Sequence, residues 1–378
     1  SGGLGSATVA YYLTRYGQGH PLKAFTSTFQ GYNEDDAHAA DSVCKSLSLS
    51  HESSRITPEI FLRQLPKIVW YLDEPIADPN IMATWELAHL SSGYSKSVFS
   101  GMGSDELLAL HSRYTMAERN SAYVSRLMLL PRPVIQKILV PLLRFFYPDA
   151  AYNILRTLRT NPWQFEYLRH NALFNENLLQ QAAPKLVHAF DPDTFLHKFH
   201  NISRIHSNVS SFLYFDVKTR LPDNFMLQYE RLTRAFNLDW QTPFLDRKLV
   251  EFSAELPEPE SLLEGETASY LKPLILDVFS PEFIQRPKKT RRHFLAGWMQ
   301  QPEVKEVFKL LMRGTLVETG LISESWLQTQ LQDPNEMEAS FSQLFSILVL
   351  EVWFRLFLNR SPGTRPPELN LKEVLLQR

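Results

Sequence analysis

Ser1-Gly2-Gly3-Leu4-Gly5-Ser6 is the stretch from which the fold of this chain can be worked out, and an apolar run typical of a helix (Ala7, Val9, Ala10, Leu13) follows it directly. Glycines allow the backbone to turn tightly and to approach a ligand closely. The helix behind the turn directs free N–H groups and the positive end of its dipole at the turn. This arrangement suits phosphate, although no Gly-Lys-Ser/Thr follows as in a Walker loop. Taken alone, the stretch is explained equally well as an ordinary Gly/Ser turn.

Length, composition and charge describe an ordinary globular chain. Its 378 residues allow a large core and two or three structural units. The net charge of −2 argues against a nucleic-acid partner, because such proteins usually carry a strongly basic face. The single cysteine, Cys44, excludes an internal disulfide and fits a reducing, cytoplasmic location. Since no strand precedes the first turn, we expect a fragment whose N-terminal part lies upstream of Ser1.

Strand-like and helix-like segments alternate over residues 1–106. We expect helices at 7–16, 33–47, 57–72 and 81–91, and strands at 22–29, 49–56 and 95–100. Thr57 is the expected N-cap of the third helix, with Pro58 at its first position. This alternation predicts the α/β class, with a parallel sheet covered by helices on both faces. Ligands of such sheets bind at the carboxyl ends of the strands, where both Gly/Ser turns (1–6 and 100–106) stand.

The strand signal fades after about residue 118, and the rest of the chain is expected to be helical. We expect helices at 123–130, 135–146, 211–221, 224–236, 248–255, 267–279 and 341–358. The predicted organisation is an α/β nucleotide-binding part (1–118), a helical part of the same domain (119–360), and a linker and tail (361–378).

Two stretches of the chain are strongly apolar. Residues 344–358 contain Glu351 and Arg355 and are shorter than the roughly 20 residues that a membrane span needs. Residues 127–147 contain Pro131, Pro133 and Pro141 together with Arg132, Lys137 and Arg144. We interpret both as buried or groove-lining helices and expect no transmembrane span. Peripheral membrane contact stays open for residues 127–147.

A second glycine-rich turn ends the third expected strand: Ser100-Gly101-Met102-Gly103-Ser104-Asp105-Glu106. Carboxylates at such a strand end can hold Mg²⁺, which prefers oxygen ligands and bridges to phosphates. Asp105 is therefore a candidate metal ligand, the alternative being that it only caps the following helix. Two turns of this kind in one sheet strengthen the phosphate interpretation of the first.

Together the motifs resemble the synthetase domain of the glutamine-hydrolysing asparagine synthase family. That family has the patterns Ser-Gly-Gly-x-Asp-Ser, Asp-Glu-Pro and Ser-Gly-(Asp/Glu)-Gly-(Gly/Ser)-Asp-Glu, which stand here at 1–6, 73–79 and 100–106. Leu221-Pro222-Asp223-Asn224, Pro243-Phe244-Leu245-Asp246, Leu249-Val250-Glu251-Phe252 and Arg286-Pro287-Lys288 continue the likeness. Lasso-peptide cyclases and β-lactam synthetases share this domain. The resemblance implies an ATP-pyrophosphatase core, of the adenine nucleotide alpha hydrolase type, followed by a large helical part.

The resemblance also implies a chemistry and a set of site residues. A substrate carboxylate would attack the α-phosphorus of ATP, and an amine would then displace AMP to form an amide. By resemblance, Ser1, Gly2, Gly3 and Ser6 hold pyrophosphate, and Ser27, Ser100 and Gly101 contact the nucleotide. Asp105 would bind Mg²⁺, and Lys288 would stabilise charge in the transition state, as positioned cations do in phosphoryl transfer.

The chain departs from the family pattern at several positions. Gly5 replaces an Asp that would bind magnesium, and Met102 replaces an acidic residue that faces the substrate. Asp239 and Gln241 stand where the family usually has Glu and Arg. Asp73, Glu74 or Asp78 are the candidates for a substitute magnesium ligand. We expect Gly5 to leave the magnesium site weak or inactive.

Three functions remain open at this point. The first is an ATP-dependent, amide-forming ligase domain acting on a small carboxylate, by resemblance aspartate, with ammonia from glutamine. The second is a degenerate homologue with a binding role, and the third is a divergent ligase acting on a peptide or another carboxylate. No N-terminal cysteine is present for the glutaminase half-reaction, so we expect that domain to be missing from this chain. We also retain a homodimer as an oligomeric state.

Overall fold

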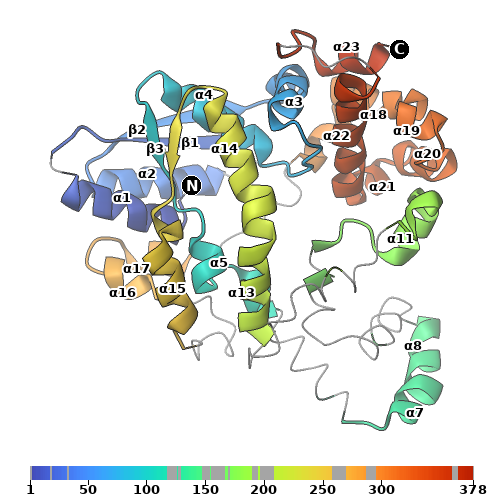
Figure 1. Ribbon diagram of the computed structural model, residues 1–378, viewed down its shortest axis with the longest axis horizontal. Helices are drawn as coiled ribbons and strands as arrows, with labels where there is room; N and C mark the ends of the chain where they lie inside the picture. The colour runs from blue at the N-terminus through green and yellow to red at the C-terminus, as the bar shows by residue number, and fades with distance from the viewer. Residues whose placement is uncertain are drawn as a thin grey trace.

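The computed structural model describes residues 2–17, 19–31, 34–116, 126, 129–146, 154, 167–168, 171–189, 195, 208–257, 270–286, 295–359 and 365–377. Figure 1 shows the α/β elements on one side of the molecule and the C-terminal helices on the other, with α3 and α14 between them. The expected class, an α/β fold with a large helical part, is confirmed.

The first parallel pair of strands is β1 (Lys23–Phe29) and β2 (Ser50–Ile56). Helix α2 (Glu34–Ser46) connects them, and the register runs from Lys23 opposite Ser50 to Phe29 opposite Ile56. Helix α1 (Leu4–Tyr16) precedes β1 and begins three residues earlier than expected. Parallel strands need a crossover of this kind, which is why the alternating pattern predicted the pair.

Helices α3 (Pro58–Leu72) and α4 (Ile81–Ser92) follow β2. The Thr57 side chain accepts a hydrogen bond from the Ile60 N–H and Pro58 opens the helix, so both predictions for this N-terminus are confirmed. Helix α3 buries Leu65, Ile68 and Leu72 completely, in one core with α4 and the C-terminal helices. The α/β part and the last third of the chain therefore share a hydrophobic core.

A second parallel pair joins β3 (Ser97–Phe99) to β4 (Asp239–Gln241). The expectation of helices alone after residue 118 was wrong at β4. Asp239-Trp240-Gln241 is too short to show the alternation over about four to eight residues that predicts a strand. Its pairing depends on β3, far away in the sequence, so tertiary context decides it.

Further helices follow in the described residues between 171 and 286, and one of them, η4, spans the break that we expected between residues 221 and 224. They include α11 (Glu176–Ala182), α13 (Asn208–Lys218), η4 (Leu221–Met226), α14 (Leu227–Arg234), α15 (Arg247–Glu255), α16 (Lys272–Ile275) and α17 (Pro281–Gln285). Between α13 and α14 the chain passes through the π-helical segment η4, which contains Pro222. A proline lacks the N–H of a regular turn, and the π geometry accommodates its loss without ending the helix.

The C-terminal helices are α18 (Pro302–Leu310), α19 (Thr315–Glu318), α20 (Glu324–Gln332), α21 (Pro334–Ala339), α22 (Phe341–Phe357) and α23 (Leu371–Leu376). Helix α22 is buried, as expected for residues 344–358. Its buried Glu351 accepts hydrogen bonds from the Thr315 N–H (2.8 Å) and the Leu316 N–H (3.0 Å) and from Arg355 Nε (2.6 Å). Glu351 therefore binds the first N–H groups of α19, and Arg355 neutralises the charge of Glu351 within the apolar helix.

The apolar segment around residues 127–147 differs from its expectation. Its described part consists of α7 (Arg132–Val134), the π-helical η1 (Ile135–Leu139) and α8 (Val140–Phe146). Ile135 and Val140 are buried, but Ile138 is 63% and Leu142 59% exposed. The expectation that this segment is buried is therefore wrong for the face that contains Ile138 and Leu142. Among the described residues, no helix is long and apolar enough to cross a membrane.

Candidate nucleotide-binding site

The first glycine-rich loop turns directly into α1. Gly2 has φ +65°, and a β-carbon there would lie 2.8 Å from the Asp36 carbonyl oxygen of α2, so only glycine fits. Gly3 is the N-cap residue of α1 and supplies no side-chain cap. The helix therefore presents its first N–H groups to the loop, as a phosphate site requires. The Ser6 hydroxyl donates to the Gly3 carbonyl (3.0 Å), within its own helix.

The second loop is anchored to the β3–β4 pair. The Ser100 N–H donates to the Gln241 carbonyl (3.0 Å), and Trp240 Nε1 donates to the Ser100 hydroxyl (2.9 Å). Gly103 has φ +87° and precedes α5 (Ser104–Leu108), which holds Asp105 in its first turn. β4 thus positions the loop that contains Ser100, Gly101 and Asp105.

The two loops are in direct contact. A β-carbon at Gly101 would lie 2.4 Å from the Ser6 amide nitrogen, and one at Gly5 would lie 2.1 Å from the Ser104 hydroxyl oxygen. The Ser104 hydroxyl donates to the Gly101 carbonyl (2.8 Å), which fixes its place between the loops. A carboxylate side chain at position 5 would therefore require Ser104 to move from its present place.

A cation that is distant in the sequence contacts the first loop. Arg286, which follows α17, forms an ion pair with Asp36 of α2 (2.5 Å) and donates to the Gly2 carbonyl (3.5 Å). The sequence pointed to Lys288 within the Arg286-Pro287-Lys288 motif and gave no role to Arg286. Lys288 and Ser1 lie outside the described residues.

Other candidate residues have partners away from the two loops. Ser27 on β1 donates to the Ala83 carbonyl of α4 (3.4 Å). In the acidic loop, Glu74 pairs with Arg231 (3.4 Å), and Asp78 accepts hydrogen bonds from the backbone (2.9 Å) and side chain (2.8 Å) of Asn80. The described residues contain no group of three His, Cys, Asp or Glu side chains that could hold a metal ion. In the acidic loop, Glu74 and Asp78 thus contact Arg231 and Asn80 and, in the part of the chain that the structure describes, form no hydrogen bond or ion pair with the two glycine-rich loops.

The sequence that contains these loops and strands matches the model of a known family. The family model described as asparagine synthase matches residues 1–355. The chain belongs to the asparagine synthase family.

Curated relatives agree at low identity. The chain is 25% identical over 390 residues to asparagine synthetase [glutamine-hydrolyzing] 1 of Bacillus subtilis (strain 168), covering 99% of this chain and 58% of that protein. It is 24% identical over 373 residues to putative glutamine-hydrolysing asparagine synthetases of Mycobacterium bovis and Mycobacterium tuberculosis, covering 96% of this chain and 54% of theirs. The chain spans little more than half the length of these asparagine synthetases.

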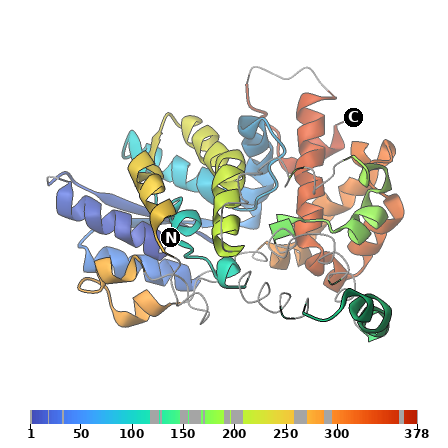
Figure 2. The ribbon, with the colours of Figure 1, turned by 60° about the horizontal axis from the view of Figure 1, so that its bottom comes forward.

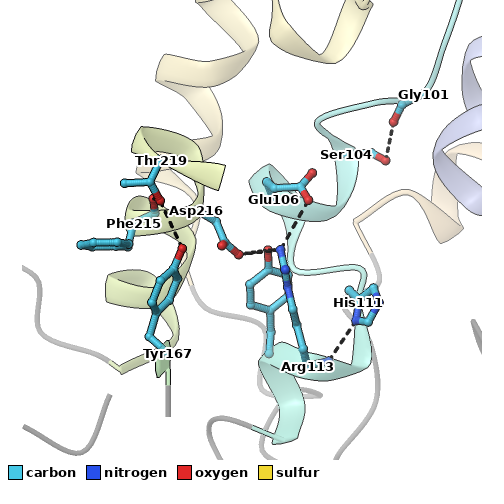
Figure 3. A network of polar contacts seen from close by, with 10 residues as sticks. Gly101, Ser104, Glu106, His111, Arg113, Tyr167, Phe215, Asp216 and Thr219 are labelled. Atoms are coloured by element: carbon cyan, nitrogen blue, oxygen red, sulfur yellow. Dashed lines mark hydrogen bonds and ion pairs between the residues drawn. The ribbon is translucent and has the colours of Figure 1, made fainter. Parts of the chain in front are cut away.

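In this family member, a buried ion-pair network lies directly behind the second loop (Figure 3). Arg113 Nη2 lies 2.5 Å from Asp216 Oδ2 and 3.4 Å from Glu106 Oε1. The Tyr114 hydroxyl donates to the same Asp216 oxygen (2.7 Å) and accepts from Arg113 (2.6 Å). The network connects α5, which holds Asp105, to α13.

Burial sets the protonation of this network. Burial raises the pKa of Asp216. The contacts with Arg113, Tyr114 and Tyr167 lower that pKa by a smaller amount, so the net shift is upward. Burial lowers the pKa of Arg113, but Tyr114, Asp216 and Glu106 raise it more, so the guanidinium stays charged. Arg113 Nε and Nη1 have no hydrogen-bond partner among the described residues. Sequence reasoning missed this network, although a buried Asp within the apolar run of α13 was a usable signal.

Proposed function

We propose that the chain is an ATP-dependent, amide-forming ligase domain that activates a carboxylate by adenylation. The observation that carries the proposal is the contact between the two glycine-rich loops, at the N-termini of α1 and α5, with Arg286 beside Gly2. A helix N-terminus and a guanidinium suit the charge and shape of pyrophosphate. Membership of the asparagine synthase family supports the same chemistry.

Each candidate residue has a proposed role in holding ATP. Ser1, Gly2, Gly3 and Ser6 at the start of α1 would bind the pyrophosphate, with Arg286 and Lys288 supplying positive charge. Ser100 and Gly101 would contact the rest of the nucleotide, as would Ser27. The Trp240 indole bonded to Ser100 would hold that loop in place.

Asp105 is the proposed magnesium ligand. Mg²⁺ is commonly bound by one or two carboxylates together with substrate phosphates and water, so one carboxylate in the first turn of α5 meets the minimum. The bound ion would neutralise phosphate charge. The Glu106–Arg113–Asp216 network would keep α5, and hence Asp105, in one position.

The reaction we propose has two balanced steps. A carboxylate oxygen of the substrate bonds to the α-phosphorus of ATP, and the bond from that phosphorus to the bridging oxygen breaks to release pyrophosphate. An amine nitrogen then bonds to the acyl carbon and loses a proton to solvent, and the bond from that carbon to the AMP oxygen breaks, so that AMP leaves with the former carboxylate oxygen. Arg286 and Lys288 would stabilise the charge that develops on pyrophosphate.

Two classes of carboxylate substrate are compatible with the proposed reaction. Aspartate, with ammonia supplied from glutamine by a glutaminase domain, is the substrate that the family implies. Met102 replaces the expected acidic residue in the second loop, which favours a carboxylate that needs no acidic partner, such as a peptide. A cytoplasmic location is part of the same proposal.

A non-catalytic binding role is the second candidate, and one observation favours it. The Ser104 hydroxyl stands against Gly5, where the family has a second acidic ligand. If one carboxylate is too few for pyrophosphate release, the loops would bind a nucleotide without turning it over.

Exchange of labelled pyrophosphate into ATP separates the two candidates. We expect exchange that requires both Mg²⁺ and a carboxylate from a panel containing aspartate and short peptides. Asp105→Asn should abolish it, while Asp277→Asn, an exposed aspartate outside the loops, should not. If the chain binds ATP but catalyses no pyrophosphate exchange with any carboxylate of the panel, the ligase proposal is contradicted and the binding role is favoured.

A further inference from the structure

The segment Arg132–Phe146 carries apolar side chains on two faces. On one face, Ile135 and Val140 are buried at 0% and 5% exposure. On the other face, Val134 (36% exposed), Ile138 (63%) and Leu142 (59%), from α7, η1 and α8 in turn, form a stripe that faces solvent, and Leu130 (45%) precedes α7. Single exposed apolar residues are normal, but a row along one helix marks an interaction surface.

The described charged side chains beside this stripe in the sequence, Arg126, Arg132 and Lys137, are all cationic. Residues 119–148 contain Arg119, Arg126, Arg132, Lys137 and Arg144 and no Asp or Glu, in a chain whose net charge is −2. The side chains of Arg126, Arg132 and Lys137 are exposed, and none forms an ion pair within the described part of the chain. The surface is thus aliphatic and cationic together, which calls for a partner that is apolar and anionic.

We propose that the stripe, with Arg132 and Lys137, is a peripheral docking surface for an anionic lipid bilayer. Helices of this type lie in the bilayer interface, with the apolar face about 5–10 Å deep and the cations at the lipid phosphates. Figures 1 and 2 both place α7 and α8 at the edge of the molecule, where a flat surface can reach them. A symmetric contact between two copies would bring the same cations together, which disfavours self-association. The surface goes beyond the proposed function and does not depend on it.

Co-sedimentation of the full chain with lipid vesicles tests the proposal. We expect binding to vesicles of phosphatidylcholine with one quarter phosphatidylglycerol, little binding to phosphatidylcholine alone, and weaker binding as salt increases. Ile138→Ser/Leu142→Ser should remove most of the bound fraction. Arg132→Gln/Lys137→Gln should weaken binding roughly fivefold for each cation removed.

A matched variant controls for loss of exposed leucine in general. Leu274→Ser/Leu276→Ser removes side chains that are 49% and 55% exposed on and beside α16, and it should bind vesicles like the unmodified chain. Equal binding to neutral and anionic vesicles, or unchanged binding by both stripe variants, would overturn the proposal. Light scattering that shows a dimer lost on Ile138→Ser/Leu142→Ser would assign the stripe to a protein contact and overturn it as well. Because the glutamine variant changes only exposed cations, it keeps the test valid if the serine variant misfolds.

Discussion

Gly5 and Ser104 fit against each other so closely that a β-carbon on Gly5 would lie 2.1 Å from the Ser104 hydroxyl oxygen and 2.9 Å from its Cβ. The glycine that replaces the family's magnesium ligand is thus matched by a serine on the opposite loop. A side chain restored at position 5 would require Ser104 or the loop around it to move. Ser104 itself agrees with the family pattern, which allows Gly or Ser at this position, so the departure lies at Gly5 and the close contact follows from it.

The first prediction concerns this pair. Gly5→Ala should destabilise the chain by about 1–3 kcal/mol, because overpacking at a close contact moves the backbone. Gly5→Asp should cost at least as much and should not increase pyrophosphate exchange. Urea denaturation followed by circular dichroism measures both free energies of unfolding.

Removal of the serine hydroxymethyl group is the control for this contact. Gly5→Ala/Ser104→Gly should recover part of the lost stability, and Gly5→Asp/Ser104→Gly is the variant in which a second carboxylate fits. A Gly5→Ala chain as stable as the unmodified one would show that the contact is loose.

The second prediction concerns the network behind the second loop. Arg113→Met should destabilise the chain by about 3–5 kcal/mol, because it leaves Asp216, which is 0% exposed, without its cation. Arg113→Met/Asp216→Leu should be more stable than Arg113→Met, since both charges are then removed. Chemical denaturation of the four chains in this double-mutant cycle gives the coupling, and strictly additive effects would contradict the network.

The third prediction is a pH dependence at Glu86 of α4. This side chain is 8% exposed, and burial raises its pKa above 4.5, opposed by His89 and by the hydrogen bond from Ser54. The folded chain therefore prefers the protonated form, which stabilises it below pH 4.5, and that contribution disappears as pH rises through the raised pKa. Glu86→Gln should thus raise the free energy of unfolding at pH 7 and leave it nearly unchanged at pH 3.5. A variant that is less stable at pH 7 would reverse this sign.

Local signals made much of the α/β part predictable. Thr57 and Pro58 mark a helix start through their own chemistry, and the apolar runs of β1 and α3 mark buried elements. β4 could not be predicted, because Asp239, Trp240 and Gln241 form a strand only when β3 lies beside them.

The candidate site was predictable in its loops but not in their connections. Glycine, serine and carboxylate residues indicated where phosphate and metal chemistry could occur. The closeness of Gly5 to Ser104, and of Arg113 to Asp216, arises from elements about 100 residues apart, which no local pattern contains. The apolar composition of residues 127–147 likewise did not reveal that Ile138 and Leu142 face solvent.

The fourth prediction concerns the thiol of Cys44. It is 5% exposed in α2, and burial raises its pKa, so it should be a poor nucleophile in the folded chain. A chromogenic disulfide reagent should react with it only as fast as the chain opens, and rapidly in denaturant. Fast reaction of the folded chain would place the thiol in a more accessible and more acidic setting than the structure gives it.

Adenylation itself is tested most directly by following a carboxylate oxygen. The chain is incubated with ATP, Mg²⁺, an amine and the carboxylate that gives the fastest pyrophosphate exchange, labelled with oxygen-18. The proposed reaction transfers one labelled oxygen to AMP for each amide formed, because AMP leaves with the former carboxylate oxygen. Label found in orthophosphate, or amide formed without labelled AMP, would contradict an adenylating ligase.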